Sequence, residues 1–132
     1  MSELQGMHFI AGSAEAVGGE VFHGVDPVAG NNLEPSYAEA TPTQVARACD
    51  GAAAAAPLFA ATAPSKRAAL LRAIADGLMG LGDDLVKRMH AETALPAARV
   101  QGERARTVMQ LQQFAALLDD GSWVDAHIDH GD

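Results

Sequence analysis

Residues 64–96 read PSKRAALLRAIADGLMGLGDDLVKRMHAETALP, and they indicate a helical chain. Apolar residues recur here every three or four positions, which is the spacing of one face of an α-helix. Pro64 suits the first turn of a helix, whereas Gly77, Gly80 and Gly82 each weaken it by about 1 kcal/mol relative to alanine. The spacing therefore predicts a long helical stretch with a break near the glycines. Its apolar stripe is formed by Leu70, Leu71, Ile74, Leu78, Leu81, Leu85 and Met89.

The helical stretch ends in Glu92-Thr93, just before Pro96. A carboxylate near the C-terminus of a helix interacts unfavourably with the helix dipole. We therefore expect a specific partner to hold Glu92.

A separate helix is predicted to precede this stretch. Thr41 is suited to the N-cap and Pro42 to the first helical position, and Gln44 completes a capping box. Pro57 is expected to kink or end the helix. The apolar face consists of Val45, Ala48, Ala52, Ala55, Ala56 and Phe59.

A further helix is predicted after Pro96, and Gly121 should stop it. The segment Ser122–Asp129 then alternates apolar and polar residues, which is typical of a strand. We therefore expect a C-terminal strand. The buried face of the helix is expected to carry Val100, Thr107, Val108, Leu111, Phe114, Ala115 and Leu118.

The N-terminal residues carry the remaining strand signals. Met7–Ile10 and Glu20–Val25 are short apolar runs, and small residues join them. This pattern predicts a β-hairpin, which must pack on something because a lone two-stranded ribbon is marginally stable. The chain is therefore predicted to be mainly α-helical, with an N-terminal β-hairpin and a C-terminal strand.

Composition limits both the core and the partners. The 132 residues suit one domain. They are 48% hydrophobic but only 5% aromatic, and much of the hydrophobic share is alanine. We expect a thin core that needs a neighbouring surface. The net charge of −8 argues against nucleic acid as a partner. Neither a signal peptide nor an apolar run long enough for a membrane is visible, so we expect a cytoplasmic protein.

Few residues suggest chemistry by themselves. No GxGxxG fingerprint follows a strand. The single cysteine, Cys49, lies in mid-helix beside alanine, and we interpret it as a small buried hydrophobe rather than a nucleophile. His127, Asp129, His130 and Asp132 cluster near the C-terminus, but a strand would place them on opposite faces, so no metal site is predicted.

The polar segment Gln101–Thr107 leaves two interpretations open. Gly102, Arg106 and Gln110 share one helix face at spacings of four residues. This face is either a solvated surface or part of a pocket in which Arg106 binds an anion, because a guanidinium matches the geometry of a carboxylate.

The order of these elements resembles the start of the aldehyde dehydrogenase superfamily. The resemblance covers essentially all 132 residues, and it rests on order and spacing rather than on one motif. In the segment Glu92–Pro96, Ala94 stands where the family usually has glycine. The matching segments are Phe9–Gly12, Val21-Phe22, Pro27–Gly30, the alanine-rich Val45–Phe59, Arg67–Leu71 and Glu92–Pro96.

Two segments are similar to the α-ketoglutaric semialdehyde (2,5-dioxopentanoate) dehydrogenases. They are Gly18–Pro27, and Gly102–Phe114 together with Gly121–Asp125. The resemblance implies an enzyme that oxidises an acidic aldehyde to 2-oxoglutarate with NAD or NADP, and that forms a homo-oligomer when full length. It also places Gly102, Arg106 and Gln110 towards the substrate.

The same resemblance implies a fragment of an α/β parent. Residues 1–132 would be a single incomplete domain, the N-terminal part of the NAD(P)-binding domain, with residues 122–132 starting the oligomerisation strand. The family's nucleophilic cysteine, general-base glutamate and cofactor-binding residues would lie downstream, so the fragment is expected to be inactive and to bind no cofactor. The alternative is a non-enzymatic helical interaction module derived from this family.

Overall fold

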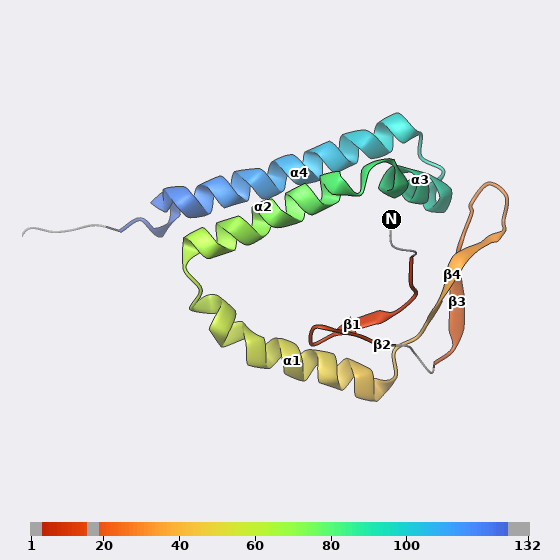
Figure 1. Cartoon of the computed structure of the whole chain (residues 1–132), viewed down its shortest axis with the longest axis horizontal. Coiled ribbons are helices and arrows are strands. Elements are labelled where there is room, and N and C mark those ends of the chain that lie inside the picture. The colour runs from red at the N-terminus through yellow and green to blue at the C-terminus, as the bar shows by residue number, and fades with distance from the viewer. Residues whose placement is uncertain (1–3, 16–18, 127–132) are drawn as a thin grey trace, which may run out of the picture. The chain divides into compact units, whose positions relative to one another are not determined.

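The computed structural model describes residues 4–15 and 19–126, which form two compact units (Figure 1). We call Met1–Ala61 with Asp83–Ala97 the hairpin unit, and Thr62–Gly82 with Ala98–Asp132 the helical unit. The hairpin unit contains the strands, α1 and most of α3, and the helical unit contains α2 and nearly all of α4. The prediction of a mainly helical chain is confirmed.

The strands form two small antiparallel hairpins instead of the one predicted. In the first, β1 (His8–Ile10) pairs with β2 (Ser13–Glu15) across the two residues Ala11 and Gly12. Both turn residues have positive φ, 50° and 82°, as in a type I′ turn. The predicted pairing of Met7–Ile10 with Glu20–Val25 is therefore wrong, because the chain reverses directly after Ile10.

The second hairpin pairs β3 (Val21–Val25) with β4 (Asn32–Ala38), with a register shift between His23 and Gly24. The Asp26 side chain shapes the turn, since its Oδ1 accepts hydrogen bonds from the backbone N–H groups of Val28 at 2.8 Å and Ala29 at 3.1 Å. These two bonds lower the pKa of Asp26. A carboxylate that bonds the backbone two or three residues onward favours a turn.

Helix α1 (Pro42–Ala60) begins as predicted. The Thr41 Oγ1 accepts from the Gln44 N–H at 3.3 Å, and the Gln44 Oε1 accepts from the Thr41 N–H at 3.0 Å, completing the capping box. Pro57 does not end the helix, which continues to Ala60. The predicted burial is wrong: α1 buries none of its residues, and Cys49 is exposed. Among the described elements, β1 packs most on α1, and it covers too little of the helix to bury that face.

The predicted glycine break and helix stop are confirmed. Helix α2 (Pro64–Gly80) and α3 (Gly82–Thr93) are separate, and Gly82 has φ 57°. Helix α4 (Ala97–Asp120) ends at Gly121, which has φ 73°.

The predicted C-terminal strand is wrong where it can be compared, because Ser122–Val124 forms a 3₁₀ helix, η1. The backbone is left-handed at Gly121, just before η1, and at Asp125, just after it. The Asp120 carboxylate accepts a hydrogen bond from the Ser122 N–H at 3.2 Å. This local bonding curls the backbone and overrides the alternating pattern. Residues 127–129 of that prediction lie outside the described residues.

The core of the described part is thin, as predicted. Large apolar side chains are exposed on most elements, including Phe9 at 80% and Phe114 at 61%. None of the described helices is long and apolar enough to cross a membrane. The buried apolar residues are Ile10, Ala38 and Val86 in the hairpin unit, and Ala68, Ala75, Val100 and Ala115 in the helical unit.

Ala94 occupies a strained position at the end of α3, with φ 58°. Left-handed backbone costs a non-glycine residue roughly 1–2 kcal/mol, partly offset by the extra freedom that glycine has when unfolded. We therefore expect Ala94→Gly to raise the free energy of unfolding by about 0.5–1 kcal/mol in urea titrations.

A matched control is Ala91→Gly, inside α3. It should lower the free energy of unfolding by about 1 kcal/mol. Destabilisation by both substitutions would show that Ala94 is not left-handed in solution.

Candidate functional site

The predicted site residues lie on an exposed face of α4. Gly102, Arg106 and Gln110 are all exposed, and apart from the neighbouring backbone of α4 no heavy atom lies within 4 Å of a Cβ built on Gly102. The space beside Arg106 on this face is therefore open on the Gly102 side. The structure brings these residues to one face, as their spacing predicts.

Glu103 holds the Arg106 side chain. Its Oε2 accepts from Arg106 Nε at 3.0 Å and Nη2 at 2.7 Å, and its Oε1 lies 2.5 Å from Nη2 of Arg99. The hydrogen bonds from Arg106, and then the charges of both arginines, lower the pKa of Glu103. The three side chains together carry a net charge of +1. Of the five N–H donors of a guanidinium, Arg106 uses two on Glu103, which leaves donors for an added carboxylate.

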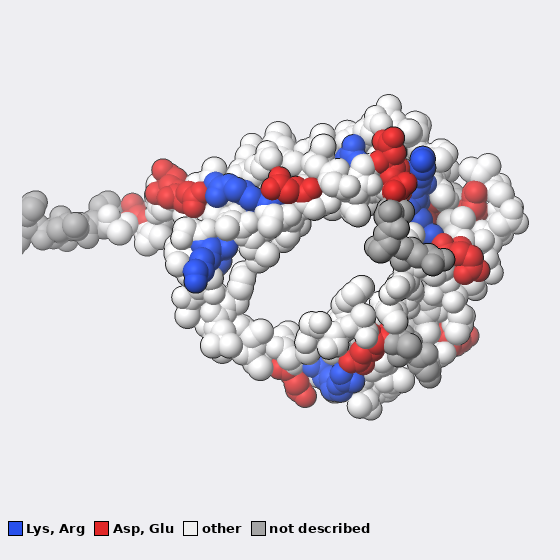
Figure 2. Space-filling view, in the orientation of Figure 1, with Lys and Arg blue, Asp and Glu red and all other residues white. Residues whose placement is uncertain are grey.

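Glu103 and Arg104, next to these residues on α4, both make specific contacts. Arg104 Nη1 donates to the carbonyl oxygen of Gly82 at 2.6 Å, which ties α4 to the residue at the break between α2 and α3. Glu103 is four residues after Arg99 and three before Arg106, and that spacing was the available signal. The face shown in Figure 2 mixes acidic and basic side chains and has no single basic patch.

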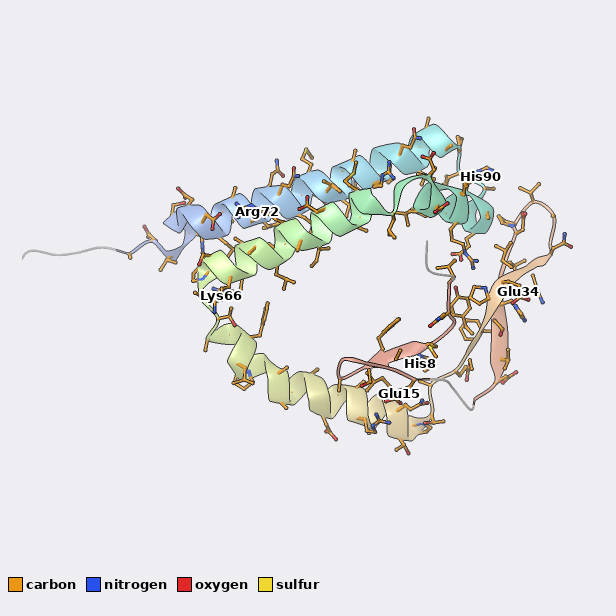
Figure 3. All side chains as sticks on the ribbon, in the orientation of Figure 1. His8, Glu15, Glu34, Lys66, Arg72 and His90 are labelled. Atoms are coloured by element: carbon orange, nitrogen blue, oxygen red, sulfur yellow. The ribbon has the colours of Figure 1, made fainter. Side chains whose placement is uncertain are left out.

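Arg88 is the partner expected for Glu92. Its Nε donates to Glu92 Oε1 at 2.6 Å, its Nη1 donates to the carbonyl oxygen of Glu34 on β4, and its Nη2 lies 3.5 Å from the Tyr37 hydroxyl. Figure 3 labels Glu34 on this strand. Gly24 leaves room for this cluster, because a Cβ there would lie 3.4 Å from both Arg88 and Glu92. The cluster fastens the β3–β4 hairpin to α3.

We expect Arg88→Ala to loosen this hairpin. Hydrogen bonds to charged groups contribute about 1.5–3 kcal/mol each when a partner is removed, so the free energy of unfolding should fall by about 2 kcal/mol. Amide hydrogen exchange in β4 should become faster. The control is Arg72→Ala, which removes the exposed pair of Arg72 with Asp119 and should cost at most about 1 kcal/mol. Equal effects would show that Arg88 is an ordinary surface charge.

Each unit has an apolar pocket among its described residues. One, of about 330 Å³, is in the helical unit and is lined by Leu71, Phe114, Leu117, Leu118 and Trp123. The other, of about 270 Å³, is in the hairpin unit and is lined by His8, Phe9, Ile10, Ala40, Gln44, Val45, Ala48 and Cys49. Cys49 lies in the middle of α1, away from the helix N-terminus that would favour a thiolate, so we assign it no catalytic role.

The one transition from a strand to a helix among the described residues lacks the usual dinucleotide-binding fingerprint. Such a site usually places a glycine-rich turn between a strand and the N-terminus of a helix, whose free N–H groups bind phosphate. The transition from β4 to α1 instead has a Thr41 cap, and its side chain occupies the Gln44 N–H. We therefore assign no cofactor contact to these residues.

Metal ligands do not gather in the part of the chain that the structure describes. No group of three or more His, Cys, Asp or Glu residues there could hold a metal ion. The cluster of His127, Asp129, His130 and Asp132 lies outside the described residues.

Comparison with known proteins gives a consistent result. The model of the aldehyde dehydrogenase family matches residues 14–128. Over 128 residues the chain is 42% identical to alpha-ketoglutaric semialdehyde dehydrogenase 2 of Azospirillum brasilense. The matched stretch covers 96% of this chain and 24% of that protein. Over 132 residues it is 33% identical to alpha-ketoglutaric semialdehyde dehydrogenase of Acinetobacter baylyi, covering 98% and 24%. The chain thus spans about a quarter of the length of these relatives.

Proposed function

Because the chain belongs to the aldehyde dehydrogenase family, we propose that it forms the N-terminal part of an NAD(P)-dependent enzyme that oxidises α-ketoglutaric semialdehyde to 2-oxoglutarate. The observation that carries this proposal is the similarity along nearly the whole chain to two proteins that bear this substrate in their names. The parent enzyme is expected to have an α/β fold, to be cytoplasmic and to form a homo-oligomer.

The reacting groups belong, in this proposal, to the other three-quarters of the parent. Covalent aldehyde oxidation needs an activated thiolate that adds to the carbonyl carbon, a hydride acceptor, and a base that activates water to hydrolyse the thioester. The exposed face of α4 offers none of these groups, because the charged residue on it, Arg106, is a cation and cannot act as the thiolate or the base. The 132-residue chain alone is therefore expected to be inactive.

Arg106 is the residue through which this chain would act on the substrate. Its guanidinium is held by Glu103 and retains donors for a second carboxylate. The semialdehyde carries a carboxylate at the end opposite its aldehyde, and a guanidinium binds such a group through paired hydrogen bonds. We place Gly102 and Gln110 beside it as the neighbouring substrate-binding positions on α4.

The test uses a chimera in which this chain replaces the matching segment of the Azospirillum brasilense protein. The chimera should reduce NAD or NADP in the presence of α-ketoglutaric semialdehyde, and the 132-residue chain alone should not. Turnover by the chain alone would contradict the placement of the reacting groups.

The alternative, a non-enzymatic interaction module, is favoured by the exposed apolar side chains of the helical unit. Light scattering and thermal unfolding distinguish the two. A cooperatively folded, specific oligomer of the lone chain would favour the module. A marginally stable monomer would favour a piece of a larger enzyme.

A further inference from the structure

Glu103 divides its two carboxylate oxygens between two arginines of α4. Its Oε2 accepts from Nε of Arg106 at 3.0 Å and from Nη2 at 2.7 Å, whereas its Oε1 lies 2.5 Å from Nη2 of Arg99. The Glu103 side chain is 28% exposed, and those of Arg99 and Arg106 are 66% and 60% exposed. The carboxylate is therefore the most enclosed of the three groups, and both guanidinium groups reach into solvent.

These hydrogen bonds decide which edge of the Arg106 guanidinium is occupied. A guanidinium has five N–H donors, one on Nε and two on each Nη. Glu103 accepts from Nε and from Nη2, which share one edge, so both donors of Nη1 and one donor of Nη2 remain. A second carboxylate can therefore form two parallel N–H···O bonds only at the end made by Nη1 and Nη2.

We propose that Glu103 is a positioning residue, which occupies the Nε edge of Arg106 and so presents the Nη1–Nη2 end to the substrate carboxylate. This inference rests on the proposed function, in which Arg106 binds α-ketoglutaric semialdehyde. A long, flexible side chain loses conformational freedom when it binds a ligand, and a side chain that is already held loses less. Glu103 thus strengthens substrate binding without touching the substrate.

The charge of Glu103 by itself would act in the opposite direction. With Glu103 ionised, the three side chains carry a net charge of +1, and without it the two arginines carry +2. A larger positive charge attracts an anionic substrate more strongly, so a purely electrostatic role predicts tighter binding when Glu103 is removed. The positioning role predicts weaker binding. The direction of the change in KM therefore separates the two roles.

Steady-state kinetics of the chimera with α-ketoglutaric semialdehyde test the proposal. Glu103→Ala should raise KM by about three- to tenfold, which is the cost of ordering one flexible side chain. The substrate carboxylate does not react, so kcat should change by less than about twofold. Glu103→Gln keeps the length of the side chain and one acceptor oxygen, and it should therefore restore part of the loss.

The matched control is Glu15→Ala in the chimera. Glu15 accepts from Arg47 through both of its oxygens, and its side chain is 21% exposed, close to the 28% of Glu103. Glu15 lies on β2 in the hairpin unit. Its replacement removes a similar ion pair that does not involve α4, so KM should stay unchanged.

A second measurement, on the 132-residue chain, does not depend on catalysis. Proton exchange of the Arg106 Nε–H, followed by NMR, should be at least about tenfold faster in Glu103→Ala, because a hydrogen-bonded proton exchanges only when its bond opens. Glu15→Ala should leave the exchange of this proton unchanged.

Four results would overturn the positioning role: an unchanged or lower KM in Glu103→Ala, an equal rise of KM in Glu15→Ala, a fall in kcat as large as the rise in KM, or Nε–H exchange that is the same with and without Glu103. None of them would contradict the proposed function as long as the chimera turns over the semialdehyde. An inactive chimera whose isolated chain still shows faster Nε–H exchange in Glu103→Ala would contradict the proposed function and support the hold of Glu103 on Arg106.

Discussion

Replacing Arg106 by alanine in the chimera is expected to raise KM for α-ketoglutaric semialdehyde by about 10- to 100-fold, with kcat changed much less. A hydrogen-bonded charge pair contributes about 1.5–3 kcal/mol, and each 1.4 kcal/mol is a factor of ten in binding. The substrate carboxylate does not change during the reaction, so its partner stabilises the ground state and the transition state alike. Steady-state kinetics with the acidic substrate measure the effect.

The neighbouring Arg99 is a close control for this prediction. It bonds the same Glu103 and has similar side-chain exposure, 66% against 60% for Arg106. If Arg106 acts as a specific carboxylate partner, Arg99→Ala should leave KM nearly unchanged, and a neutral aldehyde should be insensitive to both substitutions. An equal rise of KM with both variants would indicate a general charge effect and contradict the assigned role.

Replacing Val100 by aspartate is expected to have the largest effect on stability. Val100 is 0% exposed in α4 and is the largest fully buried side chain described. A buried carboxylate without a partner costs several kcal/mol, and we expect a loss of about 3–5 kcal/mol. Because whole domains are stable by only about 5–15 kcal/mol, the helical unit should unfold. Circular dichroism should show lost helix.

The matched control is Met109→Asp on the same helix. Met109 is 49% exposed, so a carboxylate there remains in water and should cost no more than about 0.5 kcal/mol. If Val100→Asp kept the helical signal of Met109→Asp, Val100 would not be buried in solution.

Local signals predicted the helices well. Thr41 and Gln44 form the cap that their spacing indicates. Gly82 and Gly121 adopt the left-handed backbone that separates or stops helices. Such features depend on residues within one turn of each other, so the sequence alone is sufficient to locate them.

Non-local pairing was harder to predict. The strand β2, Ser13–Glu15, is polar and only three residues long, so it lacks an apolar alternation. The strand β4 contains Pro35, which argues against a strand except at an edge. Both strands exist because a turn returns the chain onto its neighbour. Cys49 was wrongly expected to be buried for the same reason, since burial depends on what packs against α1.

The candidate site was partly predictable. The shared face of Gly102, Arg106 and Gln110 follows from helix periodicity. The hydrogen-bonded ion pair of Glu103 and Arg106 depends on side-chain rotamers. The contacts of Arg88 reach Tyr37 and Glu34, which lie 51 and 54 residues away in the sequence. Spacing within one helix carries no information about such partners.

The most direct test of the central claim is kcat/KM of the chimera with α-ketoglutaric semialdehyde, measured beside the unmodified Azospirillum brasilense protein and the lone chain. If this chain is the N-terminal part of such an enzyme, the chimera should retain kcat/KM within about tenfold of the unmodified protein, a change of about 1.4 kcal/mol in transition-state stabilisation. The lone chain should give no cofactor reduction. A folded chimera without detectable turnover would contradict the claim.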